Sequence, residues 1–144
     1  MSHKRIRKFN TKKTYPEQKL DNDLCQAVIA KGKIVFLRGQ VSQNLDTSES
    51  LHFESPAKQA EKTMENIKFL LEQAGSSLHD LCRIVVYLTD IRHRDEVYRS
   101  IGPYLVGIHP VSTGIVVSAL ARPEWVVEIE ATAVIPDSPI DNYD

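Results

Sequence analysis

Two glutamates near the C-terminal end have the side chains and spacing best suited to acid–base chemistry. Glu128 and Glu130 lie in the run Trp125–Ile135, where apolar and polar residues alternate as in a β-strand. With a rise of ~3.3 Å per residue, their carboxylates would stand roughly 7 Å apart on one strand face. Such a pair can move a proton to or from a reacting group. The same pattern is also typical of a solvated or ion-paired strand face.

Arg38 is a second candidate, because it interrupts the largely apolar run Lys33–Val41. Strand alternation would place Arg38 on the same face as Phe36 and Gln40. A guanidinium on such a face requires a partner, since an unpaired charge is costly to bury. The partner would be either the carboxylate of a small ligand or one of the two glutamates in a structural ion pair.

The remaining reactive side chains point to simpler roles. Ser112-Thr113-Gly114 lacks the strand–turn–helix context of a serine nucleophile, so these hydroxyls are either hydrogen-bond donors in a cleft or ordinary strand residues. The histidines after residue 50 lack the spacing of metal ligands, and we expect no metal. Cys25 and Cys82 lie in apolar segments without a CxxC motif, which favours buried, unreactive thiols.

Length and composition predict one ordinary globular domain. The chain has 144 residues, 42% of them hydrophobic, and its apolar runs are too short to span a membrane. We place the domain at residues 1–135, with a tail at 136–144 that begins with Pro136. No secretory signal is visible at the N-terminus, so we expect a cytoplasmic protein with no membrane partner.

The charge balance argues against nucleic acid as the main partner. With 18 basic and 19 acidic residues, the formal net charge is −1, so no domain-wide basic footprint exists. Basic residues do gather at the start of the chain, either in a solvated terminal strand or in an RNA-contacting arm. These residues are Lys4, Arg5, Arg7, Lys8, Lys12 and Lys13.

Hydrophobic periodicity predicts alternating strands and helices. Ser55-Pro56 is typical of a helix start, and Gly75 is typical of a helix end. The helix between them would bury one stripe formed by Ala60, Met64, Ile67, Leu71 and Ala74. The other predicted elements are a hairpin of Leu24–Ala30 with Lys33–Val41, a strand Cys82–Thr89, a helix Asp90–Leu105, strands Thr113–Ala119 and Trp125–Ile135, and a possible first strand Arg5–Phe9.

This order of elements predicts an α+β fold, a mixed sheet with two helices on one face. Ile34–Leu37 and Ile84–Leu88 are apolar on both sides, although the helices can cover only one. Another copy of the chain is the simplest cover for the second face. We therefore expect an oligomer, with clefts between its subunits.

Six sequence blocks, in order and at matching spacing, resemble the Rid (YjgF-like) family of reactive-intermediate deaminases, once also called L-PSP endoribonucleases. The resemblance covers roughly residues 20–135. The blocks are Gln26-Ala-Val, Val35-Phe-Leu-Arg-Gly-Gln40, Thr63-Met-Glu-Asn-Ile-Lys68, Val86-Tyr-Leu-Thr-Asp90, Glu96-Val-Tyr98 and Val127-Glu-Ile-Glu-Ala131.

The resemblance implies a chorismate-mutase-like fold and a homotrimer with three clefts at its subunit boundaries. It also implies hydrolysis of a small imine or enamine, such as 2-aminoacrylate, to a keto acid and ammonia, without a metal or organic cofactor. The expected ligand is a small carboxylate in its keto or imino form.

The family's site residues carry over only in part. Its strand glutamate matches Glu128, and the glycine of its Ser-Gly-Gln turn matches Gly39, but Arg38 replaces the serine. In the family's Pro-x-Arg-Ser/Thr segment, the carboxylate-binding arginine is replaced by Ser112, which Thr113 follows. Leu24 stands where the family has a tyrosine.

The missing arginine should cost a charge-assisted contact worth roughly 1.5–3 kcal/mol. We therefore expect Glu128 to place a water, with Arg38, Gly39, Ser112 and Thr113 binding a substrate other than 2-aminoacrylate. The first alternative is a trimer that binds a small ligand without catalysis, as a sensor or chaperone-like protein. The second is a ribonuclease, supported only by the basic N-terminal segment.

Overall fold

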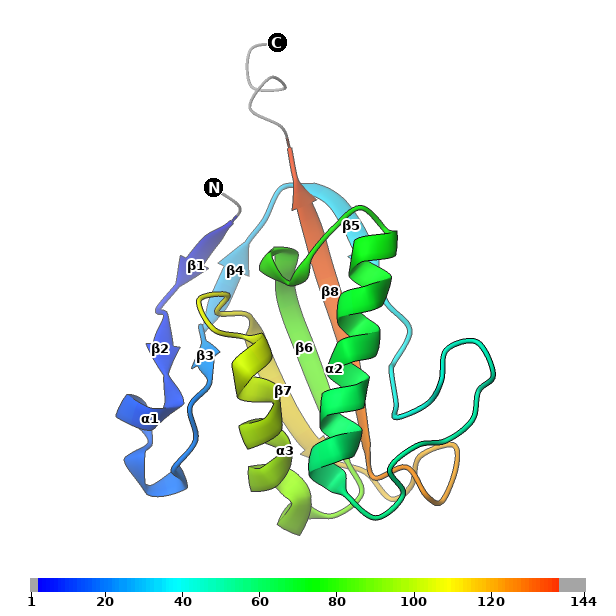
Figure 1. The fold of residues 1–144 in the computed structure, drawn as a ribbon. Helices are drawn as coiled ribbons and strands as arrows, with labels where there is room; N and C mark the ends of the chain where they lie inside the picture. Colours follow the sequence, from blue (N-terminus) through cyan, green and yellow to red (C-terminus); the bar gives the residue numbers. More distant parts are fainter. Residues whose placement is uncertain (1–2, 138–144) are drawn as a thin grey trace.

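The computed structural model describes residues 3–137, which form two layers (Figure 1). A four-stranded sheet lies behind two helices, α2 (Pro56–Gln73) and α3 (Arg94–Ile101), which both cover the same face. Short strands and turns of the N-terminal segment flank α3 and one side of the sheet. The predicted α+β class, with two helices on one face of a mixed sheet, is confirmed.

The sheet has the order β5-β8-β6-β7 and mixes both strand directions. β8 (Val127–Pro136) pairs antiparallel with both β5 (Gly32–Phe36) and β6 (Leu81–Leu88). β6 pairs in parallel with β7 (Val111–Val116), and α3 lies in the crossover between them. Parallel strands require such a long connection, and here it places α3 over β7.

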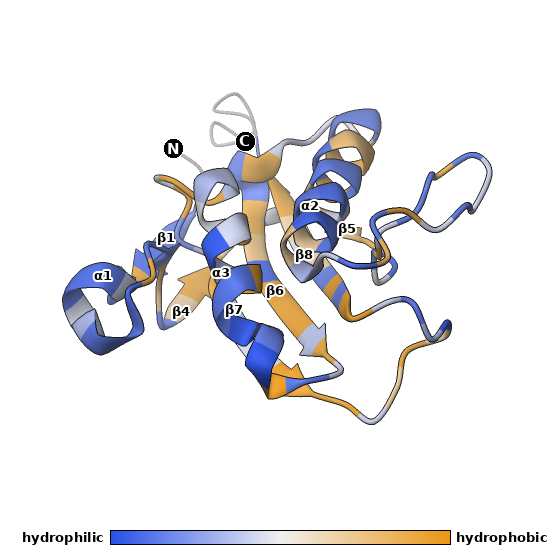
Figure 2. Ribbon diagram, turned by 60° about the horizontal axis from the view of Figure 1, so that its bottom comes forward, coloured by the Kyte–Doolittle hydropathy of each residue, from blue (hydrophilic) through white to orange (hydrophobic). Residues whose placement is uncertain are grey.

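Helix α2 forms as its sequence predicts. The Ser55 hydroxyl accepts a hydrogen bond from the Lys58 amide at 3.1 Å, which caps the first turn. Ala60, Met64 and Ile67 are fully buried, whereas Ala74, at the end of the predicted stripe, is exposed. The outward faces of the helices are hydrophilic, and the strands behind them are mostly hydrophobic (Figure 2).

The core lies between these helices and the sheet. Val127, Ile129, Ala131 and Ala133 of β8 are at most 1% exposed, which confirms the alternation predicted for this strand. Pro136 still belongs to β8 and pairs with Gly32, so the domain extends one residue beyond the predicted boundary. Residues 138–144 of the predicted tail lie outside the described residues.

The predicted hairpin is wrong. β4 (Ala27–Ile29) pairs with β1 (Lys4–Ile6), whereas β5 pairs with β8, so the turn signal at Lys31-Gly32 separates two sheets. The predicted first strand is also divided, because Arg7 takes a positive φ of 54° between β1 and β2 (Phe9–Asn10). The remaining N-terminal elements are α1 (Thr11–Thr14), a 3-10 turn at Pro16–Gln18, and β3 (Asp23–Leu24), which pairs with β2.

The second predicted helix is shorter than its apolar pattern suggested. Regular helix covers only Arg94–Ile101, and 3-10 turns at Ile91–His93 and Gly102–Tyr104 flank it. Ile91, which lies within the predicted helix Asp90–Leu105, is 63% exposed. Pro103 lies in the second turn, where its missing amide hydrogen prevents the α-helix from continuing. A further 3-10 turn, Leu78–Asp80, precedes β6.

A one-residue irregularity interrupts the pairing of β5 with β8. Phe36 pairs with Thr132, and pairing resumes between Gln40 and Ile129. Four residue steps along β5 and its continuation therefore oppose three steps along β8. This is the count of a β-bulge, and the extra residue falls at Arg38-Gly39. Gln40 is consequently buried while Arg38 is exposed, so the prediction that they share a face is wrong.

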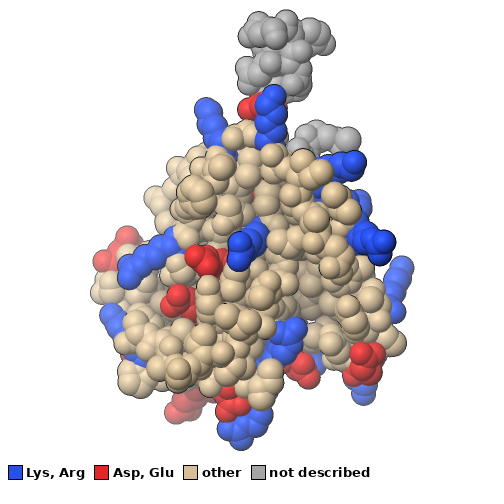
Figure 3. Space-filling model, turned by 180° about the vertical axis from the view of Figure 1, so that it is seen from behind, with Lys and Arg blue, Asp and Glu red and all other residues tan. Residues whose placement is uncertain are grey.

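The sheet face that turns away from the helices is open in one chain. Ile34 and Phe36 of β5 are 59% and 77% exposed, and Ile115 of β7 is 43% exposed. β6 is covered more completely, since Val85 is 5% exposed, although Arg83 is exposed on the same side. Uncharged side chains cover most of this face, with a few acidic and basic groups among them (Figure 3).

Candidate functional site

Three of the predicted site residues line one cavity. Arg38, Gly39 and Glu128 surround a hollow of about 540 Å³, next to the β-bulge of β5 and the beginning of β8. The remaining lining residues come from two loops and from the entry to β8. They are Val41, Gln43, Ser48, Ala121, Arg122 and Trp125.

The absence of a side chain at Gly39 allows the carboxylate of Glu128 to lie against the backbone. A Cβ atom at residue 39 would stand only 2.9 Å from Cδ of Glu128 and closer still to its Oε2. Backbone hydrogen bonds fix this approach, because the Gln40 amide donates to Ile129 at 2.8 Å and the Ile129 amide donates back at 2.9 Å. Gly39 therefore sets the position of the Glu128 carboxylate.

Burial raises the pKa of Glu128 above its usual range. The nearby guanidinium of Arg38 opposes this shift, and the negative charge of Glu130 adds to it. A carboxyl group with a raised pKa is a better proton acceptor once it is ionised, because its conjugate acid is weaker. Glu128, partly buried beside Gly39 and Arg38, is therefore a candidate general base.

Glu130 has a different setting on the same strand face. It is exposed, and its carboxylate accepts a hydrogen bond from the hydroxyl of Tyr87 at 3.0 Å. This hydrogen bond, followed by burial, raises the pKa of Tyr87. Within one chain, Glu130 does not line the cavity that Glu128 lines.

Arg38 has no ion pair in residues 3–137, so the predicted pairing with a glutamate does not form within one chain. The cavity also holds a second cation that the sequence analysis missed. The guanidinium of Arg122 lies 4.6 Å from the ring centre of Trp125 and donates hydrogen bonds to the Ser48 carbonyl and the Ser50 hydroxyl. With two guanidinium groups and one carboxylate, the described cavity wall favours an anionic ligand.

Ser112 and Thr113 lie outside the cavity that Glu128 lines. Both belong to β7, which β6 separates from β8, and neither lines the cavity of Glu128. Ser112 faces the helices, where its hydroxyl is 3.0 Å from that of Tyr98 on α3. Thr113 pairs with Val85 and faces the open side of the sheet. Within one chain, the structure therefore does not unite the five predicted site residues.

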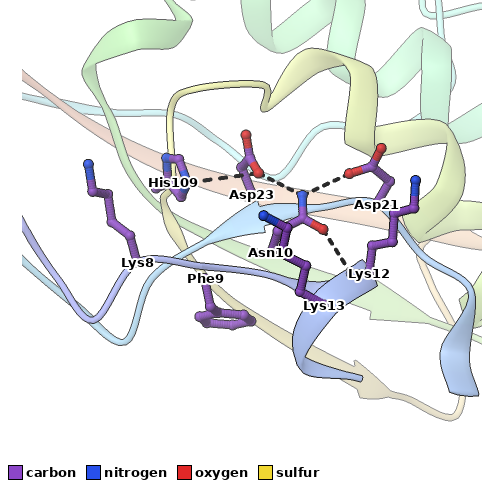
Figure 4. Close-up of a pocket in the computed structure, with 8 residues that line it drawn as sticks. All are labelled: Lys8, Phe9, Asn10, Lys12, Lys13, Asp21, Asp23 and His109. Carbon is purple, nitrogen blue, oxygen red and sulfur yellow. Dashed lines mark hydrogen bonds and ion pairs between the residues drawn. The ribbon is translucent and has the colours of Figure 1, made fainter. Parts of the chain in front are cut away.

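A second cavity, of about 490 Å³, lies beside the N-terminal strands (Figure 4). The amide of Asn10 donates hydrogen bonds of 2.7 Å to both Asp21 and Asp23, and His109 lies 3.8 Å from Asp23 on the other side. Although burial opposes it, hydrogen bonds from the Gly107 amide and Asn10 lower the pKa of Asp23. These groups satisfy one another, so they stabilise the loop rather than form a reactive centre.

The basic N-terminal residues have divided roles. Arg5 donates hydrogen bonds to the carbonyls of Leu81, His109 and His79, which ties β1 to the main domain. The prediction of a solvated terminal strand is therefore wrong for Arg5. The lysines at positions 8, 12 and 13 line the second cavity, where Asp21 and Asp23 offset their charge.

The cysteines and the potential metal ligands of the described residues form no further candidate reactive site. Cys25 and Cys82 are buried, free thiols, and burial raises the pKa of each. No group of three potential metal ligands occurs among residues 3–137. No helix in the same part of the chain is long and apolar enough to cross a membrane.

The chain matches a known protein family over most of its length. Residues 18–135 match the profile of the family described as Endoribonuclease L-PSP, and the chain belongs to that family, which includes the Rid and YjgF proteins. Among curated relatives, protein DfrA of Myxococcus xanthus is 37% identical over 110 residues, covering 76% of this chain and 82% of DfrA. A RutC family protein of Pyrococcus abyssi is 30% identical over 105 residues, covering 73% and 81%.

Solved structures agree with this assignment. YyfB of Yersinia pestis, a member of the Rid family with unknown function, has a TM-score of 0.77 and 28% identity, covering 94% of this chain and all of YyfB. RidA of Psychrobacter sp. has a TM-score of 0.66 and 33% identity, covering 74% of this chain and 85% of RidA. The YjgF-like fold expected from the sequence is thus confirmed.

Proposed function

We propose that this protein hydrolyses a small imine or enamine to a keto compound and ammonia. The observation that carries this proposal is the carboxylate of Glu128, which is held against Gly39 in a cavity with two guanidinium groups. Membership of the Rid family supports the same chemistry. Because Ser112 replaces the family arginine, the expected substrate differs from 2-aminoacrylate.

Glu128 acts as the general base in this reaction. Its carboxylate takes a proton from a water molecule while the water oxygen bonds to the imine carbon and the C=N electron pair moves to nitrogen. Glu128 returns this proton to the nitrogen, which becomes an amino group. Glu128 then takes the hydroxyl proton as the C=O bond forms and passes it to the nitrogen, which leaves as ammonia. The atoms and charges balance without a redox partner or cofactor.

Arg38 supplies positive charge at the entrance to the cavity. It is exposed, lacks an ion pair in the described chain, and lies near enough to Glu128 to affect its pKa. It therefore attracts an anionic substrate and favours the ionised form of the base. Arg122 and Trp125 line the same cavity, and the Arg122 guanidinium is already held by Ser48.

The proposed assembly is a homotrimer with its clefts at the subunit boundaries. One chain exposes Ile34, Phe36 and Ile115 on the open sheet face, and burial of such a surface favours association. A closed ring would cover this face and give the shallow Glu128 cavity a second wall. The family resemblance supports three subunits in the ring.

Imines generated in solution test the proposed activity. An amino-acid oxidase produces 2-imino acids from several amino acids, and the rate of keto acid release is measured with and without this protein. We expect faster release for at least one imine. Glu128→Gln should remove the acceleration, and Glu72→Gln, at an exposed position of α2, serves as the matched control.

Binding without acceleration would contradict this proposal and favour the alternative of a non-catalytic ligand-binding trimer. The observation that favours this alternative is the absence of an arginine at position 112. A thermal shift with a small keto acid, combined with an unchanged release rate for every imine, would identify it. Cleavage of RNA without imine hydrolysis would instead support the ribonuclease hypothesis, for which the lysines of the second cavity are the candidate contacts.

A further inference from the structure

A third guanidinium lies on the other side of the sheet. Here α3 covers the edge strand β7 (Figure 1). Arg94, the first residue of α3, places its guanidinium carbon 4.5 Å from the ring centre of Tyr98. The two residues are separated by one helical turn, so stacking on the aromatic ring fixes the orientation of the arginine. Tyr98 itself is 4% exposed and therefore forms a rigid support.

Gly114 of β7 provides the space for this arrangement. A Cβ atom at residue 114 would stand 2.6 Å from the Tyr98 hydroxyl and closer still to a terminal nitrogen of Arg94. Any larger residue would displace the guanidinium from the strand. The Tyr98 hydroxyl is also 3.0 Å from the Ser112 hydroxyl, so three groups with hydrogen-bond donors surround one position on β7.

Arg94 has no anionic partner among the described residues. Within residues 3–137, its half-buried guanidinium forms no ion pair and no hydrogen bond. Two acidic side chains of the same segment are engaged elsewhere, since Asp90 binds Arg92 and Glu96 lies 3.9 Å from His93. A preorganised, partly desolvated guanidinium without a partner is suited to bind a carboxylate through two parallel hydrogen bonds.

We propose that Arg94, supported by Tyr98 and Gly114 and assisted by the Ser112 hydroxyl, binds the carboxylate of a small keto or imino acid. The choice of ligand rests on the proposed function. Arg94 lies on the helix side of the sheet, whereas Glu128 faces the open side. A single ligand therefore contacts both residues only across a boundary between two copies of the chain.

Binding of 2-oxobutanoate and of its neutral methyl ester, measured by calorimetry, tests this inference. Replacing Arg94 with Gln should weaken binding of the acid at least tenfold and leave binding of the ester unchanged, since only the acid carries the charge. Arg99→Gln, on the exposed side of the same helix, should change neither. Arg94→Lys keeps the charge but loses the planar guanidinium. Its affinity for the acid should therefore lie between those of the wild type and Arg94→Gln.

Equal binding of the acid by the wild-type protein and by the Arg94→Gln variant would overturn the inference, as would a wild-type protein that does not bind the acid. If Arg94→Gln unfolds, Arg94→Lys provides the comparison. Arg94-dependent binding without imine hydrolysis would contradict the proposed function and leave the anion site standing. Imine hydrolysis by Arg94→Gln with an unchanged KM for the charged substrate would support the proposed function and contradict the anion site at Arg94.

Discussion

At the scale of single residues, the proposed function depends on the environment of one carboxyl group. Glu128 and Glu130 have the same side chain and the same strand face, yet only Glu128 is half-buried against Gly39 in a cavity. Glu130 is exposed and accepts a hydrogen bond from the Tyr87 hydroxyl. Burial and neighbouring charges, rather than residue type, separate the candidate base from its neighbour.

Replacing Glu128 with Gln should lower kcat/KM for the imine substrate by about a hundredfold to ten-thousandfold, the usual contribution of a general base. The shape of the side chain is nearly retained, so binding of the keto acid product should change little. Steady-state kinetics and calorimetry measure the two quantities. Full activity in this variant would show that Glu128 is not the base.

The pH dependence should report the charges around Glu128. Activity requires the ionised carboxylate, so kcat/KM should rise with pH through the raised pKa of Glu128. Removal of the positive charge in Arg38→Met should raise this pKa further and move the acid limb of the profile to higher pH. Removal of the negative charge in Glu130→Gln should lower the pKa and move the limb to lower pH.

These two opposite shifts separate an electrostatic effect from structural damage, which would lower activity without moving the limb in a defined direction. Profiles of all three proteins that coincide would contradict the assigned environment of Glu128.

At the scale of elements, local patterns predicted α2 and β8, and non-local pairing limited the rest. The Ser55 cap and the apolar spacing of α2 depend on neighbours along the chain, as does the alternation of β8. The turn at Lys31-Gly32 was also visible, but its hairpin was wrong because each flanking strand has a more distant partner. No local signal marks which strands will pair.

The site was only partly predictable for the same reason. Glu128 and Gly39 emerged from the family resemblance, but the bulge that brings them together follows from pairing between β5 and β8. Arg94 and Tyr98 were missed, although an arginine four residues before an aromatic residue on a helix is a visible signal. Their relation to Ser112 depends on the crossover that places α3 over β7.

The bulge at Gly39 provides a test at this scale. Gly39→Ala should push the Glu128 carboxylate from its position and lower kcat/KM, while the free energy of unfolding falls only slightly because a side chain, not backbone, must move. Denaturant unfolding and kinetics give both values. In a Glu128→Ala background, Gly39→Ala should no longer lower the free energy of unfolding, because the clashing carboxylate is gone. If Gly39→Ala costs as much stability in that background as in the wild type, the proposed contact is contradicted.

At the scale of the whole molecule, the two layers leave one surface unexplained by a single chain. Phe36 is 77% exposed on the open sheet face, and Ile34 and Ile115 extend the same apolar surface. The Glu128 cavity opens beside β5, and the proposed Arg94 site lies at the opposite edge of the sheet. Association between copies would cover the face and bring different edges of the sheet together.

Phe36→Glu should weaken this association, because it places a charge in the proposed interface. Phe69→Glu is the matched control, since Phe69 is 52% exposed on the helix layer. We expect smaller particles and reduced imine hydrolysis for the first variant, with the second behaving as the wild type. Size-exclusion chromatography and the imine assay measure both effects.

Sedimentation equilibrium of the wild-type protein in dilute buffer tests the proposed assembly most directly. We expect a particle with the mass of three 16.3 kDa chains, which persists at concentrations where the protein is active. A stable, folded single chain that hydrolyses imines at full rate would contradict it, because neither the covered sheet face nor the cleft between subunits would then be needed.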